Sequence, residues 1–172
     1  MREGRTKYGS FNVMLRGSGL YVLVREYEIE GRSIYSLPGG GLRKDETEES
    51  CAAREAEEES GYVVKVEPVI GEYYQGRSRH GNRLFRKVFL STIIAGEARP
   101  TERHPEIIEV PFDELVALRD QDQLRANIDF DAAHDHFTGK YLERGIGEIT
   151  ISQSQEVIIE PIPQMALFTM AN

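Results

Sequence analysis

The residues best suited to chemistry are glutamates concentrated in one short segment. Residues 46–59 read ETEESCAAREAEEE and hold seven Glu and one Arg, a formal charge of −7 + 1 = −6. The segment is rich in helix formers and has no internal Gly or Pro, so it is predicted to be helical. On a helix, Glu55, Glu58 and Glu59 are i, i+3 and i+4 neighbours within an arc of about 100°. Like charges at this spacing repel each other, so the cluster needs a physical explanation.

Two explanations fit such a cluster. A charge run is most often the solvated face of a surface helix, and composition alone favours that explanation. The alternative is a metal site, because Mg²⁺ and Mn²⁺ prefer carboxylate oxygens and also bridge substrate phosphates. Arg54 lies four residues before Glu58 and is spaced to hold its carboxylate in a fixed direction. The carbonyls of the Gly39-Gly40-Gly41 turn would complete the coordination shell if the helix lies against it.

Secondary-structure elements must bring these groups together. Runs of Val, Ile, Leu, Tyr and Phe predict strands at residues 9–16, 20–26, 33–37, 62–74, 84–94 and 106–110, with loops at 75–83 and 97–105. The three glycines at 39–41 are expected to end the strand before them. Helices are predicted at residues 47–60, with Asp45 or Thr47 as N-cap and Gly61 as C-terminal cap, and at residues 111–118 and 130–143.

The segment from Gly40 to Tyr62 resembles the Nudix box. That pattern is Gly, five residues, Glu, seven residues, Arg-Glu, an aliphatic position, any residue, Glu-Glu, any residue, Gly and an aliphatic position. All seven fixed positions match, namely Gly40, Glu46, Arg54, Glu55, Glu58, Glu59 and Gly61. Ala56 and Tyr62 stand at the two aliphatic positions and are mild departures that touch no chemistry. The preceding Leu37-Pro38-Gly39 is also typical of the family.

The resemblance implies an α/β fold, the Nudix-type α/β/α sandwich around a mixed β-sheet. It predicts a single domain over residues 1–172 with a core of about residues 8–120. It says little about a C-terminal extension of about residues 121–172, where a helix and a β-prone tail are expected. The tail from Ile149 to Ile162 carries Pro161 and is followed by Pro163, which suits an edge strand or an arm that builds a homodimer.

The resemblance also implies roles for individual residues. Glu55, Glu58 and Glu59 are the implied Mg²⁺ ligands, with Mn²⁺ as a possible substitute, and the Gly39 carbonyl is a further candidate. Arg54 and Glu46 are implied to orient these carboxylates. The general base of the family lies either on this helix or on a downstream loop. Our candidate for the loop position is Glu106, and the alternatives Glu109 and Glu102 stay open.

Residues outside the box are candidates for substrate binding. The stretch from Arg77 to Lys87 is the densest positive segment, and Arg79 and Arg83 within it are suited to gripping terminal phosphates. A solvated hairpin loop explains the same residues equally well. Tyr74 is a candidate for stacking on a base and Arg43 for touching the substrate, although core packing and surface solvation are the simpler explanations.

Composition limits the possible partners. The chain has 172 residues and a net charge of −8, which argues against nucleic-acid polymers because their affinity comes largely from protein cations. No apolar run reaches membrane-spanning length, and the start, MREGRTKYGS, does not resemble a secretory signal, so cytoplasmic localisation is expected. Cys51 is the only cysteine and is expected to be a small buried thiol.

Three functions remain open. The leading one is a Mg²⁺-dependent pyrophosphohydrolase that cuts the phosphoanhydride bond of a nucleoside diphosphate linked to another moiety. Its substrates would be a nucleoside triphosphate, a dinucleoside polyphosphate, ADP-ribose or a nucleotide sugar. The second is a module that senses a nucleotide without cutting it, against which the intact glutamates count. The third is an isoprenoid diphosphate isomerase, for which Cys51 is poorly placed.

Overall fold

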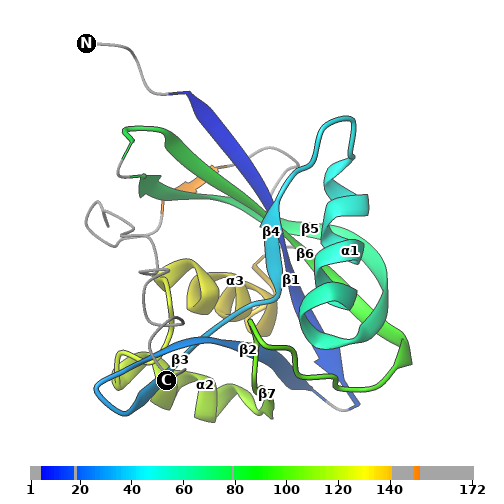
Figure 1. The fold of residues 1–172 in the computed structure, drawn as a ribbon, viewed down its shortest axis with the longest axis vertical. Helices are drawn as coiled ribbons and strands as arrows, with labels where there is room; N and C mark the ends of the chain where they lie inside the picture. The colour runs from blue at the N-terminus through cyan, green and yellow to red at the C-terminus, as the bar shows by residue number, and fades with distance from the viewer. Residues whose placement is uncertain (1–4, 18, 79, 141–148, 152–172) are drawn as a thin grey trace, which may run out of the picture.

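A mixed eight-stranded sheet with helices on both faces forms the framework (Figure 1). The computed structural model describes residues 5–17, 19–78, 80–140 and 149–151. The elements are β1 (Thr6–Arg16), β2 (Leu20–Ile29), β3 (Arg32–Ser36), β4 (Gly39–Gly41), α1 (Glu48–Ser60), β5 (Tyr62–Arg77), β6 (Arg83–Gly96), β7 (Ile107–Val110), α2 (Phe112–Asp120), α3 (Asn127–Phe137) and β8 (Ile149–Ile151). The main strand order is β3-β2-β1-β6-β5-β8, with β4 paired to β1 and β7 paired to β2.

Strand β1 is the centre of the sheet and organises the rest. One edge pairs in parallel with β6 along ten residues, and the other edge is shared by two antiparallel partners. Near its start β1 pairs with β4, and at Leu15 and Arg16 it pairs with β2. The predicted first hairpin is therefore confirmed, and the mixture of parallel and antiparallel pairs confirms the mixed sheet.

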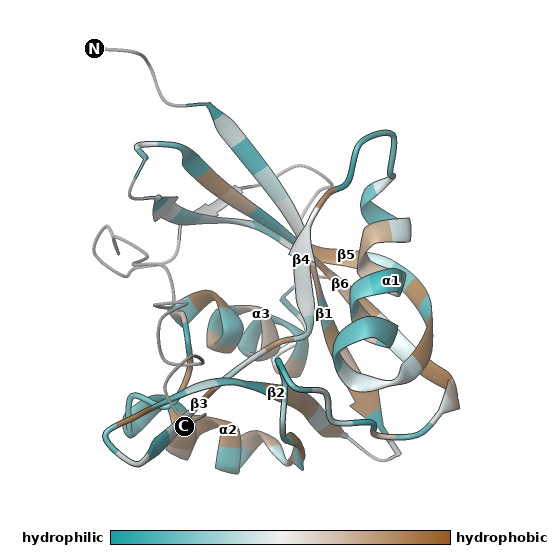
Figure 2. Ribbon diagram, in the orientation of Figure 1, coloured by the Kyte–Doolittle hydropathy of each residue, from teal (hydrophilic) through white to brown (hydrophobic). Residues whose placement is uncertain are grey.

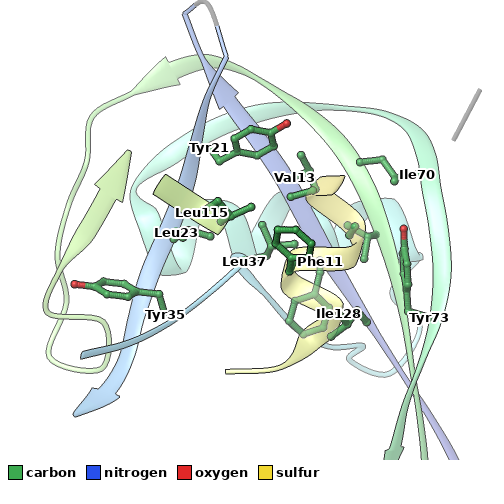
Figure 3. Close-up of a cluster of buried hydrophobic side chains, with 14 of the residues drawn as sticks. Phe11, Val13, Tyr21, Leu23, Tyr35, Leu37, Ile70, Tyr73, Leu115 and Ile128 are labelled. Carbon is green, nitrogen blue, oxygen red and sulfur yellow. The ribbon is translucent and has the colours of Figure 1, made fainter. Parts of the chain in front are cut away.

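Alternate residues of β1 face opposite sides of the sheet, as a strand requires. Phe11 and Val13 pack in one buried cluster with Leu115 of α2 and with Ala132 and Ala133 of α3 (Figure 3). On the opposite face, a second cluster joins buried side chains of β1, β2, α1 and β5, which are Met14, Val22, Ala56, Tyr62 and Val64. Helix α1 thus covers one face while α2 and α3 cover the other, so the predicted α/β/α sandwich is confirmed.

Helix α1 begins and ends where its capping residues require. The Thr47 side chain accepts a hydrogen bond from the Ser50 amide, at 3.1 Å, which selects Thr47 over Asp45 as the N-cap. Gly61 adopts a left-handed conformation, with φ of 81°, and closes the C-terminus. Glu48 lies in the first turn, where the helix dipole favours a negative charge. Figure 2 shows that most of the ribbon of α1 is hydrophilic beyond its first turns.

One expected boundary was wrong, and one segment formed an unexpected strand. The strand before the glycines ends at Ser36, as expected, but Gly39–Gly41 then form strand β4, because residues without a Cβ lie close against Phe11 and the neighbouring backbone of β1. The helix expected at residues 130–143 is α3, which starts earlier and ends at Phe137. Gly139, with φ of 71°, follows at the position where left-handed backbone terminates a helix.

The chain after α2 contacts the strand that leads into β4. The Tyr35 amide donates to the Gln123 carbonyl at 2.8 Å, and the Arg125 amide donates to the Tyr35 carbonyl at 2.8 Å. Buried Asp129 of α3 accepts a hydrogen bond from the Leu37 amide at 3.2 Å. The extension therefore fixes the backbone that immediately precedes β4.

The β-prone tail is described only over β8, which pairs in parallel with β5. The rest of the predicted edge strand, and with it the proposed homodimer contact, lies outside the described residues. Among the helices of the described part of the chain, none is both long and apolar enough to span a membrane.

Asn12 should be an energetically important polar residue of the core. Its amide donates to the Pro38 carbonyl, at 3.1 Å, and to the Ala52 carbonyl, at 2.9 Å, while its oxygen accepts from Ser91 at 2.8 Å. We expect Asn12→Ala to lower the free energy of unfolding by about 2 kcal/mol, because the substitution leaves buried polar groups unpaired. Urea denaturation measures the loss. Ser91→Ala should cost about half as much, and equal losses in the two variants would contradict the assigned role of Asn12.

Asp129 should make stability depend on pH. Burial raises the pKa of this carboxyl from 3.8 to about 6, against the opposing charge of Arg86. Between these two values the unfolded chain releases a proton that the folded chain retains, so folding loses stability as the pH rises. The contribution is on the order of 2 kcal/mol, present below about pH 4 and lost by about pH 6. Urea titrations measure the free energy of unfolding of the unaltered chain and of Asp129→Asn at pH 4 and at pH 7. The free-energy difference between the two proteins should change by about this amount between the two pH values. A difference that stays the same would contradict the role assigned to Asp129.

Candidate active site

The glutamates of α1 lie against the backbone of β4. Ala52 and Ala56 are fully buried in the face of the helix that meets the sheet, and their small size allows the close approach. A Cβ on Gly40 would overlap the carboxylate of Glu55, so a larger residue here would displace that carboxylate from its present position. The sulfur of Cys51 lies 3.6 Å from the Gly40 carbonyl and is buried, as the sequence predicted for this thiol.

Arg54 is the centre of a network of carboxylates. Its guanidinium binds both oxygens of Glu46, with Nε to Oε1 at 2.7 Å and Nη2 to Oε2 at 3.0 Å. Its Nη1 atom contacts Glu55 at 2.5 Å and Glu58 at 3.2 Å, and Nη2 also donates to the Gly41 carbonyl at 3.3 Å. One planar cation thus offsets the charge of three glutamates and links them to β4.

The acidity of these groups follows from their partners. The hydrogen bonds from Arg54 and from the Arg43 amide lower the pKa of Glu46 to about 2. Burial raises the pKa of Glu55, and the charges of Glu59 and Glu58 add to this effect against the hydrogen bond from Arg54. The bond to Glu46 raises the pKa of Arg54 further above its already high value. Glu46 and Arg54 therefore form a permanent ion pair that orients the neighbouring carboxylates.

Glu58 differs from its neighbours in exposure. Its side chain is 48% exposed, whereas that of Glu55 is 13% exposed. Arg43 donates to both of its oxygens from Nη2, at 3.0 and 3.1 Å, and is itself 61% exposed. The candidate substrate residue Arg43 therefore lies directly beside a candidate catalytic carboxylate, and both can move without disturbing the core.

Glu59 is held deep beneath β4. Its Oε2 atom accepts a hydrogen bond from the Gly39 amide at 2.9 Å, and its Oε1 atom lies 3.1 Å from Nε2 of His104. Gly39 thus contacts Glu59 through its amide, whereas the atom proposed from the sequence as a metal ligand is its carbonyl. Burial lowers the pKa of His104, but the Glu59 carboxylate, whose Oε1 atom lies 3.1 Å from Nε2, outweighs burial and raises the pKa above the ordinary value.

The donor set fits the divalent cation that the sequence implies. Within the described ranges no three acidic, imidazole or thiol groups already converge as a metal cage. The three carboxylates nevertheless supply the oxygen ligands that Mg²⁺ prefers, and Gly40 leaves room for Glu55 against the backbone. Coordination by all three requires Glu58 to leave Arg43, which its exposure allows. Glu55, Glu58 and Glu59 are the residues that would hold the ion.

The downstream acidic candidates lie apart from this network. Glu106 accepts a hydrogen bond from the Tyr35 hydroxyl at 3.0 Å and lies 3.8 Å from Arg25, and among the described residues no hydrogen bond or ion pair links it to Arg54. Glu109 accepts hydrogen bonds from Tyr62 at 2.5 Å and from Arg16 at 2.8 Å. Glu102 is exposed in the loop after β6. The assignment of the general base to Glu106, Glu109, Glu102 or a carboxylate of α1 therefore stays a prediction.

The remaining substrate candidates gather at the β5–β6 hairpin. The Arg83 guanidinium lies over the rings of Tyr74, at 6.0 Å, and Phe85, at 5.3 Å. Phe85 in turn stacks on Tyr8, which is 49% exposed. Among the described residues no hydrogen bond or ion pair joins Tyr74 or Arg83 to the glutamates of α1, although Lys87, farther along β6, pairs with Glu48 in the first turn of α1. Arg79 lies outside the described residues.

Sequence reasoning did not identify His104. The loop at residues 97–105 carries no periodic pattern, and a single histidine within it gives no signal of its partner. The pairing of β7 with β2 and the hydrogen bond from the Arg99 amide to the Ser60 carbonyl, at 2.9 Å, hold the loop beside α1, so the contact is a consequence of tertiary structure.

Comparisons with known proteins address the family. An ADP-ribose pyrophosphatase from Methanocaldococcus jannaschii is 28% identical over 78 residues, covering 45% of this chain and 46% of that protein. A putative 8-oxo-dGTP diphosphatase from Bacillus subtilis is 30% identical over 90 residues, covering 52% of this chain and 56% of that protein. The matches thus span about half the length of these curated relatives.

Solved structures show the same fold at low sequence identity. A NUDIX hydrolase from Nitrosomonas europaea superposes with a TM-score of 0.69 at 20% identity, covering 79% of this chain and 91% of that one. An ADP-ribose pyrophosphatase from Streptococcus suis gives a TM-score of 0.59 at 16% identity, covering 84% and 98%. The family model of the NUDIX domain matches residues 7–132, well over half of the sequence. With the box residues assembled on α1 and β4, this match shows that the chain belongs to the NUDIX family.

Proposed function

We propose that the chain is a Mg²⁺-dependent pyrophosphohydrolase that cuts the phosphoanhydride bond of a nucleoside diphosphate linked to another moiety. The observation that carries the proposal is the set of four glutamates, Glu46, Glu55, Glu58 and Glu59, held against β4 by Arg54 and its partners. Surface solvation alone does not account for it, because Glu46, Glu55 and Glu59 are largely buried. Burial of several like charges is costly unless they serve a ligand of opposite charge.

The chemistry of each group follows from its position. A bound divalent cation supplies charge neutralisation at the phosphate oxygens and makes water more acidic. Glu58 is the most exposed of the three ligand candidates and is placed to accept the proton of an attacking water. As the water oxygen bonds to one phosphorus, the opposite P–O bond breaks and the bridging oxygen departs with the second phosphate. Arg54 keeps Glu46 and Glu55 fixed throughout and takes no proton.

The substrate class is a proposal of the same kind. The two curated relatives are named for ADP-ribose and 8-oxo-dGTP, and both compounds contain a nucleoside with a phosphoanhydride. We extend the class to nucleoside triphosphates, dinucleoside polyphosphates and nucleotide sugars. Arg43, beside Glu58, is placed to contact a phosphate, and Tyr74 with Arg83 offers a flat surface for a base.

A nucleotide sensor without activity is the second candidate. It would share the fold and the nucleotide affinity, but it has no need of the carboxylates, which silent members of the family usually lose. An isomerase acting on isoprenoid diphosphates is disfavoured because Cys51 is buried between α1 and β4, with Arg54 3.5 Å from its sulfur.

A substrate panel tests the proposal. Purified protein with Mg²⁺ is assayed for release of phosphate, pyrophosphate or nucleoside monophosphate from a nucleoside triphosphate, a dinucleoside polyphosphate, ADP-ribose and a nucleotide sugar. We expect turnover of at least one member and none after chelation of the metal. Binding of a nucleotide without turnover would instead support the sensor.

Glu58→Gln should lower kcat by at least about 10²-fold, because it removes a ligand or proton acceptor needed in the transition state. Steady-state kinetics on the best panel substrate measures the effect, and circular dichroism checks that the fold is intact. Glu57→Gln is the matched control, since Glu57 is an exposed neighbour on the same helix with its side chain outside the Arg54 network. The site is misassigned if both variants retain near-normal kcat.

A further inference from the structure

The Glu59 carboxylate is fixed in a way that neither Glu55 nor Glu58 shares. Its side chain is 7% exposed, and no arginine contacts it among the described residues. Its two oxygens contact groups from two other segments, the Gly39 amide before the box and the His104 ring after β6. The direction in which Glu59 faces is therefore set from outside α1.

The His104 ring is itself held rigidly. The His104 amide donates to the Thr101 hydroxyl at 3.0 Å, and the Thr101 amide donates back to the His104 carbonyl at 2.9 Å. The ring atom Nδ1 lies 3.2 Å from the Arg25 carbonyl of β2. With a side chain that is 2% exposed, His104 has almost no freedom to turn.

The orientation of the ring leaves its second nitrogen directed at Glu59. A carbonyl oxygen only accepts hydrogen bonds, so Nδ1 must carry a proton to bond to Arg25. Nε2 is buried and lies 3.1 Å from Glu59, but it is not aligned in a hydrogen bond with any group. Buried polar atoms without an aligned partner are uncommon and call for an explanation. Because both ring nitrogens face acceptor oxygens, both must carry a proton to donate, and a modest rotation of the Glu59 carboxylate would bring it into line with the Nε2 proton.

We propose that His104 is a positioning residue of the metal site, which holds the Glu59 carboxylate in the direction from which it coordinates a divalent cation. The inference rests on the proposed function, because it assumes that Glu59 is a metal ligand. Partners that orient a coordinating group typically raise metal affinity although they never touch the ion. His104 would act in this way from a loop that the Nudix box does not include.

The surroundings of His104 support a fixed role. His104 interacts electrostatically with buried Glu26, whose carboxylate is held by Ser36 at 2.6 Å and by Arg125 at 2.7 Å. The ring thus lies in a buried polar region that is anchored on β2, β3 and the chain after α2. Because His104 contacts Arg25 of β2 on one side and Glu59 on the other, it fixes the position of Glu59 relative to the sheet.

Metal titration of the full chain tests the proposal. Isothermal titration calorimetry with Mn²⁺ alone is carried out on the unaltered chain, His104→Leu and His104→Gln, and thermal unfolding without metal reports the stability of each. We expect His104→Leu to weaken Mn²⁺ binding by about 10- to 100-fold. His104→Gln keeps an N–H donor toward Glu59 and should recover most of the affinity. His134→Leu, on α3 at the opposite face of the sheet, is the control and should bind Mn²⁺ normally.

Thr101→Val provides a second test should His104→Leu fail to fold. It keeps the imidazole but removes the hydroxyl that accepts a hydrogen bond from the His104 backbone amide, and a loss of affinity of about threefold is expected. Unchanged affinity in His104→Leu, or in Thr101→Val when the former is unfolded, would overturn the inference. Equal weakening by Leu and Gln would overturn it too, because the N–H donor would then be irrelevant. If the unaltered chain takes up no Mn²⁺, the proposed function fails along with the inference.

Discussion

Mutual repulsion among the glutamates of α1 is the constraint on which the rest of this structure depends. Carboxylates three and four residues apart on a helix destabilise it unless positive charge lies between them. Arg54 supplies that charge as a rigid fork, binding Glu46 on one side and Glu55 and Glu58 on the other. Lysine could not replace it, because a single ammonium group cannot contact three carboxylates in fixed directions. The helix thus remains folded while keeping Glu58 exposed.

The same cluster dictates the backbone opposite it. Glu55 can keep its carboxylate against the Gly40 backbone because Gly40 has no side chain, and the Gly39 amide donates to Glu59 because β4 lies close to α1. Pairing of β4 with β1, and the two hydrogen bonds from Asn12 to Pro38 and Ala52, hold that separation. The glycines therefore bring the backbone and the carboxylates into direct contact, which no bulkier sequence permits.

What the sequence could reveal of this arrangement was mostly local. The extent of α1 followed from Thr47 and Gly61, since caps act on adjacent residues, and the spacing of the glutamates defined their common face. The pairing of β4 was not foreseen, because glycine triplets carry no strand propensity of their own. The contacts of His104 and Glu106 were also beyond sequence reasoning. Both depend on how β7 pairs with β2, and no periodic pattern in the sequence around either residue predicts that pairing.

The residues after the box-containing core have a structural part in the site. Asp129 of α3 holds the Leu37 amide, two residues before the Gly39 amide that binds Glu59. Glu59 in turn meets His104, which is anchored to Arg25 on β2. These contacts lie in the interior and join segments that are distant in sequence. A shift of α3 would therefore alter the position of Glu59 through only a few hydrogen bonds and contacts. The motif supplies the reactive groups, and the surrounding fold determines the directions in which they face.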